Sequence, residues 1–222
     1  QQVLESRVSI DPKPQYFHQR TDYFGNIPHV FMVQEPHEQL SIVADSTVVT
    51  SAPVTPSPAA TVPWETVVQR LAAHNHPAEL DAYQFVFPSP LITVIPGAMA
   101  YARPSFTQGI PVLAGAVNLM RRIFTEFTYD KSATTVDTSV DQVLANRKGV
   151  CQDFAHFAIS CLRSLGLAAR YVSGYLKTVP PPGKPKLIGA DASHAWISLF
   201  VPDTGWVDLD PTNNLIPDER HV

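Results

Sequence analysis

Cys151, His194 and Asp210 are the residues whose types and order could perform nucleophilic catalysis. A thiol nucleophile needs an imidazole that takes its proton and a third group that orients the imidazole. Here Cys151 would attack a carbonyl carbon, while His194 takes the thiol proton and later protonates the leaving amine. Asp210 would accept the other imidazole N–H and fix the tautomer. The three residues therefore predict acyl transfer at an amide through a thioester.

The residues around Cys151 predict a helix that begins at the thiol. A glycine, Gly149, precedes it, and apolar residues then recur at helical spacing until Gly166, which is typical of a helix end. Unpaired backbone N–H groups and the positive end of the helix dipole favour a thiolate at Cys151. The backbone N–H of Cys151 is also a candidate oxyanion donor, and a second donor is not identified.

The residues after Gly166 predict an antiparallel sheet. Period-two patterns cover 169–175, 195–201 and 206–210, and a turn lies at 202–205. That turn would bring His194, at the start of one strand, beside Asp210, at the end of the next. A helix followed by an antiparallel meander indicates an α+β fold.

The sequence as a whole predicts a chain of three parts. Residues 1–55 alternate as strands and form an N-terminal β module, with turns at 11–14 and 22–26. Residues 56–110 are a linker with short helices, and the stretch 51–63, which overlaps its start, is rich in proline, serine, threonine and alanine. Residues 111–222 are the catalytic core, which opens on a helix over 111–127 and continues with a short helix capped by Thr138.

Several residues have competing interpretations. Asp208 shares a strand face with Asp210 and is the rival third member, although Asp210 has the strand-end position. Cys151 alone could be a structural cysteine, whereas Cys161 falls on the apolar helix face and is expected in the core. His156 is expected to be structural, because it lies about 140° around the helix from Cys151.

Four further residues are predicted to support the site. Asp153 could stabilise the helix N-terminus, and it could form a buried ion pair with Arg170. Gln152 and Trp196 are candidates for contacts with substrate or with the oxyanion. Trp196 could instead belong to the core.

Composition limits the partners and the cellular setting. Sixteen Lys and Arg residues against 20 Asp and Glu give a net charge of −4, which gives no reason to expect nucleic acid or an anionic membrane. No apolar run could span a bilayer. Two cysteines about 15 Å apart along one helix predict reduced thiols and a cytoplasmic location. The abrupt start without Met suggests a piece of a longer protein.

Four motifs in order resemble the transglutaminase-like superfamily, most closely its bacterial branch with an N-terminal β region. They cover residues 149–156, 169–175, 194–196 and 205–213, and the turn at 22–26 resembles one of the β region. The resemblance implies a papain-like α+β fold and a Cys-His-Asp triad at Cys151, His194 and Asp210. It also implies that relatives continue past both ends of this chain.

The function expected from this resemblance is that of a cysteine protease, amidase or acyltransferase. The acyl donor would be a peptide bond or a glutamine side chain of a peptide or protein, the acceptor would be water or an amine, and the triad requires no metal or cofactor. Hydrolysis, transamidation and deamidation share the triad, so it does not choose among them. The alternative is a catalytically silent fold that serves as a binding or scaffold module.

Overall fold

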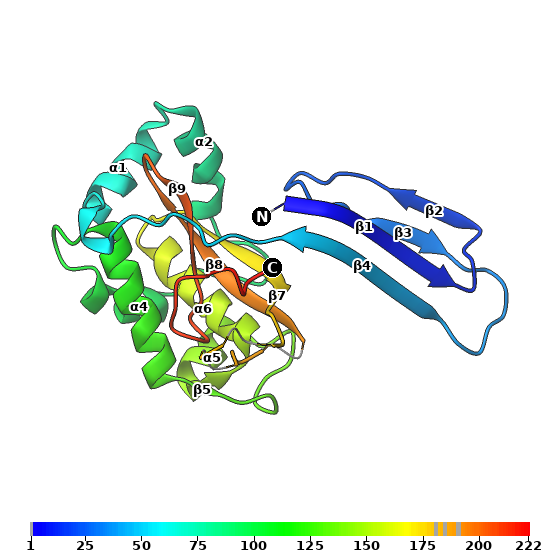
Figure 1. Ribbon diagram of the computed structural model, residues 1–222. Helices are drawn as coiled ribbons and strands as arrows, with labels where there is room; N and C mark the ends of the chain where they lie inside the picture. Colours follow the sequence, from blue (N-terminus) through cyan, green and yellow to red (C-terminus); the bar gives the residue numbers. More distant parts are fainter. Residues whose placement is uncertain (1, 180–181, 184–185, 190–191) are drawn as a thin grey trace. The chain divides into compact units, whose positions relative to one another are not determined.

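The chain forms two compact units, Gln1–Thr50 and Ser51–Val222. A computed structural model describes residues 2–179, 182–183, 186–189 and 192–222 (Figure 1). The second unit contains all three predicted triad residues, and the first contains only strands among its described elements. The three-part division predicted from the sequence stays a prediction, but residues 56–110 share the core of the second unit through Val67, Leu71 and Ala102.

The N-terminal unit consists of two antiparallel strand pairs. Strand β1 (Gln2–Asp11) pairs with β4 (Ser41–Val49), and β2 (Tyr16–Gln19) pairs with β3 (His29–Met32). The turn at 22–26 is closed by Asp22, whose carboxylate accepts the backbone N–H groups of Phe24 and Asn26 at 2.9 and 2.8 Å. The predicted N-terminal strands are therefore confirmed. Strand β2 was not predicted, because four residues are too few to show an alternating pattern.

The second unit surrounds its core with helices. Helix α4 (Val112–Glu126) carries the predicted apolar face, and Leu113, Leu119 and Ile123 are almost fully buried. The capping prediction for the next helix was wrong by one residue, because Ser139 rather than Thr138 accepts the N–H of Gln142. The helices are α1 (Trp64–Ala73), α2 (Pro77–Tyr83), α3 (Pro96–Ala102), α4 (Val112–Glu126), α5 (Val140–Asn146) and α6 (Cys151–Ser164), with 3-10 turns at Pro58–Ala60, Gln84–Val86 and Arg103–Ser105.

An antiparallel sheet packs against α6 (Figure 1). Its order is β7 (Ala169–Tyr175), β8 (Ser193–Val201) and β9 (Gly205–Leu209). A short parallel pair, β5 (Thr128–Tyr129) and β6 (Lys148–Gly149), leads the chain into α6. The predicted arrangement of a helix packed on an antiparallel meander is confirmed. Helix α6 forms one layer, and the sheet of β7, β8 and β9 forms the layer packed against it.

Helix α6 is the centre of this core. From Asp153 to Arg163 every residue of the helix is buried, so the sheet covers one side and other helices cover the rest. Gly166 follows with a φ of 81°, a left-handed conformation that glycine adopts without strain, and it ends the helix as predicted. Because neighbours hold α6 on all sides, its first residue has a fixed position.

Candidate active site

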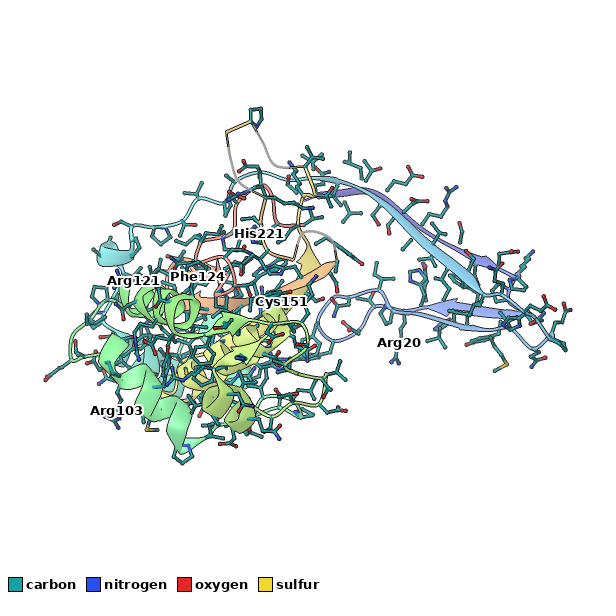
Figure 2. All side chains as sticks on the ribbon, turned by 90° about the horizontal axis from the view of Figure 1, so that it is seen from below. Arg20, Arg103, Arg121, Phe124, Cys151 and His221 are labelled. Carbon is teal, nitrogen blue, oxygen red and sulfur yellow. The ribbon has the colours of Figure 1, made fainter. Side chains whose placement is uncertain are left out.

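Cys151 is the first residue of α6 and is partly exposed (Figure 2). The helix start is held by Asp153, whose Oδ2 accepts the backbone N–H of Val150 at 2.7 Å and the hydroxyl of Thr134 at 2.6 Å. A Cβ at position 149 would lie 2.6 Å from that same Oδ2, so only glycine fits the turn before the thiol. The predicted stabilisation of the helix start by Asp153 is present in this form.

The second cysteine has a different environment. Cys161 is fully buried in the core, and burial raises the pKa of its thiol well above the ordinary value. A buried neutral thiol is a poor nucleophile, because the thiolate is the reactive form. Cys161 is therefore a packing residue, as its place on the apolar face predicted.

His194 and Asp210 meet inside the unit. The imidazole Nε2 lies 2.9 Å from Oδ2 of the carboxylate, and both side chains are completely buried. An ionised carboxylate can only accept, so Nε2 carries the hydrogen and Nδ1 is the other, potentially basic, nitrogen. The β8–β9 hairpin thus brings together the two residues that the sequence placed at one sheet edge.

Asp210 is held by its own turn. Its Oδ1 accepts the backbone N–H groups of Thr212 and Asn213 at 2.9 and 3.2 Å, and its Oδ2 also accepts the side-chain amide of Asn213 at 2.8 Å. Burial raises the pKa of Asp210, but hydrogen bonds from His194, His221 and Asn213 outweigh burial and lower it to about 2. The carboxylate is therefore a fixed anion at neutral pH.

The protonated form of His194 is stabilised from two sides. Burial lowers the pKa of His194. Its interactions with Asp210 and Cys151 have the opposite and larger effect, so the pKa rises to about 9. Nδ1 makes no hydrogen bond of ordinary geometry with the described residues, but the Cys151 side chain lies near enough to raise the pKa of His194 through both hydrogen bonding and charge. Gly189 approaches that nitrogen closely, since a Cβ there would lie 2.5 Å from Nδ1.

Asp208, the rival third member, has another partner. Its Oδ2 accepts the indole N–H of Trp196 at 3.2 Å, and Trp196 stacks on the His194 ring at a centroid distance of 6.1 Å. Within the described part of the chain, Asp210 and not Asp208 hydrogen-bonds to His194. Because Trp196 donates its only side-chain N–H to Asp208 and is 3% exposed, it supports the imidazole from beside the site and does not fit the oxyanion role.

The expected ion pair between Asp153 and Arg170 was wrong. Asp153 turns back to the start of α6, as described above, while the Arg170 guanidinium lies 4.2 Å from the centroid of the Trp206 ring. Burial lowers the pKa of Arg170, and the charge of Asp208 partly offsets that effect. Gln152, the remaining candidate for substrate contacts, donates its side-chain amide to the carbonyl of Val136 at 3.2 Å.

His221 is a site residue that sequence reasoning missed. Its Nε2 lies 3.1 Å from the same Asp210 oxygen that receives His194, and its side chain is 1% exposed. Its backbone reaches the site through an isolated bridge to Leu176, far away in the sequence. No local periodicity or motif marks such a contact.

A metal ion is not needed to explain these three side chains. The nitrogens of His194 and His221 and the Asp210 oxygen all lie within 4.8 Å of one another, as ligand atoms would. Both imidazole–carboxylate distances, 2.9 and 3.1 Å, are ordinary hydrogen-bond lengths. The geometry therefore fits two imidazoles that donate to one carboxylate.

The buried pair predicts how stability depends on pH. The folded-state pKa of Asp210 is lowered from 3.8, so its contribution is complete above pH 3.8 and disappears as the pH falls towards 2. The folded-state pKa of His194 is raised from 6.5, so its contribution is complete below pH 6.5 and disappears as the pH rises towards 9. Thermal melting should therefore show a Tm plateau between these limits. The alkaline decline should be smaller in His194→Ala, and equal declines in both proteins would contradict the assignment.

Among the described residues, no helix is both long enough and apolar enough to cross a membrane.

Comparison with known families and proteins gives matches along most of the chain. Residues 101–211 match the family model of the transglutaminase-like superfamily, and residues 1–49 match that of the bacterial transglutaminase-like N-terminal region. An uncharacterized protein of Mycobacterium tuberculosis is 42% identical over 232 residues, which cover 100% of this chain and 71% of that protein.

Two further matches are more distant in sequence. A protein-glutamine gamma-glutamyltransferase of Pseudomonas aeruginosa is 32% identical over 93 residues, which cover 41% of this chain and 14% of that protein. A solved structure from Cytophaga hutchinsonii, described as that of a candidate cysteine protease, has a TM-score of 0.71 at 20% identity. It covers 100% of this chain and 69% of its own, and this similarity supports the fold.

Proposed function

This chain belongs to the transglutaminase-like superfamily, and from that premise we propose that it is a cysteine-dependent enzyme that transfers or hydrolyses an acyl group at an amide. The observation that carries the proposal is the buried hydrogen bond between His194 and Asp210, together with the electrostatic effect of Cys151 on His194. A buried imidazole that interacts with both a carboxylate and a thiol can hold and return a proton.

The proposed reaction has two steps. The Cys151 thiolate attacks the amide carbonyl carbon, the C–N bond breaks, and protonated His194 gives its proton to the departing nitrogen. The product is a thioester on Cys151 and free ammonia or amine. In the second step His194 takes a proton from water or an acceptor amine, whose attack on the thioester releases the acid or a new amide and regenerates the thiolate.

Asp210 serves both steps without changing its own charge. It accepts the Nε2 hydrogen of His194, which keeps Nδ1 available for the reacting proton, and it stabilises the imidazolium. The backbone N–H of Cys151 stays our candidate oxyanion donor, because it lies at the start of α6.

The proposed acyl donor is the amide of a peptide or protein. The name of the Pseudomonas aeruginosa relative, a protein-glutamine gamma-glutamyltransferase, makes a glutamine side chain the first donor to test. Release of free ammonia would indicate attack on that side-chain amide, whereas cleavage of the chain would indicate attack on a peptide bond. Incorporation of a labelled amine then separates transamidation from hydrolysis.

The first test is the pH dependence of iodoacetamide labelling at each cysteine, measured by mass spectrometry. In the folded protein Cys151 should be labelled readily at neutral pH, while Cys161 should stay unlabelled. The substitution His194→Ala should change the pH profile of Cys151 labelling. Labelling of Cys151 that is as slow as that of Cys161, or a profile unaffected by His194→Ala, would favour the silent scaffold over the enzyme.

A further inference from the structure

His221 is fixed by the backbone on both sides of it. The Val222 N–H donates to the Tyr175 carbonyl at 2.8 Å, and the Tyr175 N–H donates to the Val222 carbonyl at 2.7 Å. The Lys177 N–H donates to the Arg220 carbonyl at 2.9 Å. Residues 220–222 therefore run antiparallel to the end of β7 and its continuation, and this pairing places the His221 imidazole beside Asp210.

The orientation of the Asp210 carboxylate does not depend on His221. Two backbone N–H groups hold Oδ1, and the Asn213 side chain holds Oδ2, all from the turn that follows β9. The distinctive effect of His221 is therefore on charge: it donates to the same oxygen that receives His194. A carboxylate oxygen that accepts an additional hydrogen bond stabilises the positive charge of its other partners less strongly.

We propose that His221 acts on the reaction through Asp210: it donates its Nε2–H to this carboxylate and so limits how strongly the carboxylate holds a proton on His194. The inference rests on the function proposed above, in which His194 must both hold and release a proton. A carboxylate that stabilised the imidazolium too strongly would slow proton release to the leaving group. The second imidazole would bring the proton affinity of His194 closer to what both steps require.

Charged groups on other elements also lie near this pair of imidazoles. From α6, Cys151 raises the pKa of His194. From the C-terminal segment, the Asp218 carboxylate lies 3.8 Å from Nδ1 of His221, and Asp218 also binds the guanidinium of Arg220 at 2.7 Å. The Asp210 carboxylate lies nearer to the rings than this Asp218 contact, at 2.9 Å from His194 and 3.1 Å from His221.

Iodoacetate labelling of Cys151 tests the proposal. Iodoacetate is an anion, so protonated His194 attracts it, and the labelling rate should fall as His194 loses its proton near pH 9. The variant His221→Met replaces the imidazole by an apolar side chain of similar volume that has no hydrogen-bond donor. Asp210 should then hold the His194 proton more strongly, and the falling limb should move up by about half to one pH unit. In His221→Gln, whose amide N–H can reach the same oxygen, the limb should stay close to that of the wild type.

The outcomes separate this inference from the proposed function. If the falling limb disappears in His194→Ala, the thiol–imidazole pair is supported, whatever the His221 variants show. If the falling limb persists in His194→Ala, the result counts against the proposed enzymatic function. A folded His221→Met protein with an unmoved limb would overturn the role of His221 alone, as would equal shifts in the Met and Gln variants.

A second measurement does not depend on a variant that folds. ¹⁵N NMR of histidine-labelled wild-type protein reports which ring nitrogen carries hydrogen. The proposal expects Nε2 of His221 to stay protonated across the pH range in which His194 titrates. A neutral His221 with hydrogen only on Nδ1 could not donate to Asp210, and this result would overturn the proposal.

Discussion

Substitution of Cys151 by serine should lower the turnover of an amide substrate on the order of 10⁴-fold or more while the protein stays folded. The serine hydroxyl occupies nearly the same space at the start of α6, so packing is retained. The serine hydroxyl proton is much harder to remove than a thiol proton. The interaction of Cys151 with His194, which raises the pKa of His194, would also be lost. Ammonia release from a glutamine peptide, measured beside thermal melting, gives both quantities.

Cys161→Ala is the matched control for this loss. It removes the only other thiol from the same helix, and because Cys161 lies in the core its expected effect is a Tm lower by a few degrees. Turnover by the folded protein should stay near that of the wild type. If Cys151→Ser kept comparable activity, the nucleophile would have to be another residue.

The second large effect is expected from Asp210→Asn. This change replaces an anion by an amide of the same shape, and the buried His194 Nε2 would then face a group that can itself donate. To accept from that amide, the imidazole must place its hydrogen on Nδ1, where the proton of the thiol would have to go. Turnover should fall on the order of 10⁴-fold, with little change in substrate affinity.

Asp208→Asn provides the comparison within the same segment. Asp208 accepts from Trp196, and an asparagine oxygen can still accept there, so kcat should change by less than about tenfold. Initial rates across pH for both variants would test the difference. Similar losses in the two variants would mean that general disturbance of β9, rather than the His194 carboxylate, explains the effect.

The sequence predicted the elements that carry the site because their signals are local. The apolar spacing after Cys151 and the stop at Gly166 define α6, and period-two patterns define β7, β8 and β9. A hairpin of known length then fixes which strand ends meet. The contact between His194 and Asp210 follows from that geometry, even though 16 positions separate them.

Contacts that depend on distant segments were not predictable in the same way. His221 reaches Asp210 only because the C-terminal segment pairs beside β7, which leaves no trace in local pattern. The Arg170 prediction failed because opposite charge suggested Asp153, whereas the packed fold offers Arg170 the face of Trp206. The sequence predicted short helices over 56–110 but did not place α3, because seven residues beginning Pro-Gly have weak helical propensity and depend on tertiary packing.

The burial of α6 has a consequence for how the protein loses its reactive centre. A helix with exposed faces can open locally, at a free energy far below that of complete unfolding. Helix α6 buries every residue from Asp153 to Arg163, so its opening would expose the centre of the core. The backbone hydrogen bonds of its buried residues are therefore expected to belong to the slowest-exchanging part of the second unit. We expect α6 to be lost only when that unit unfolds as a whole, so that the chemistry of the thiol and the fold disappear in a single cooperative event.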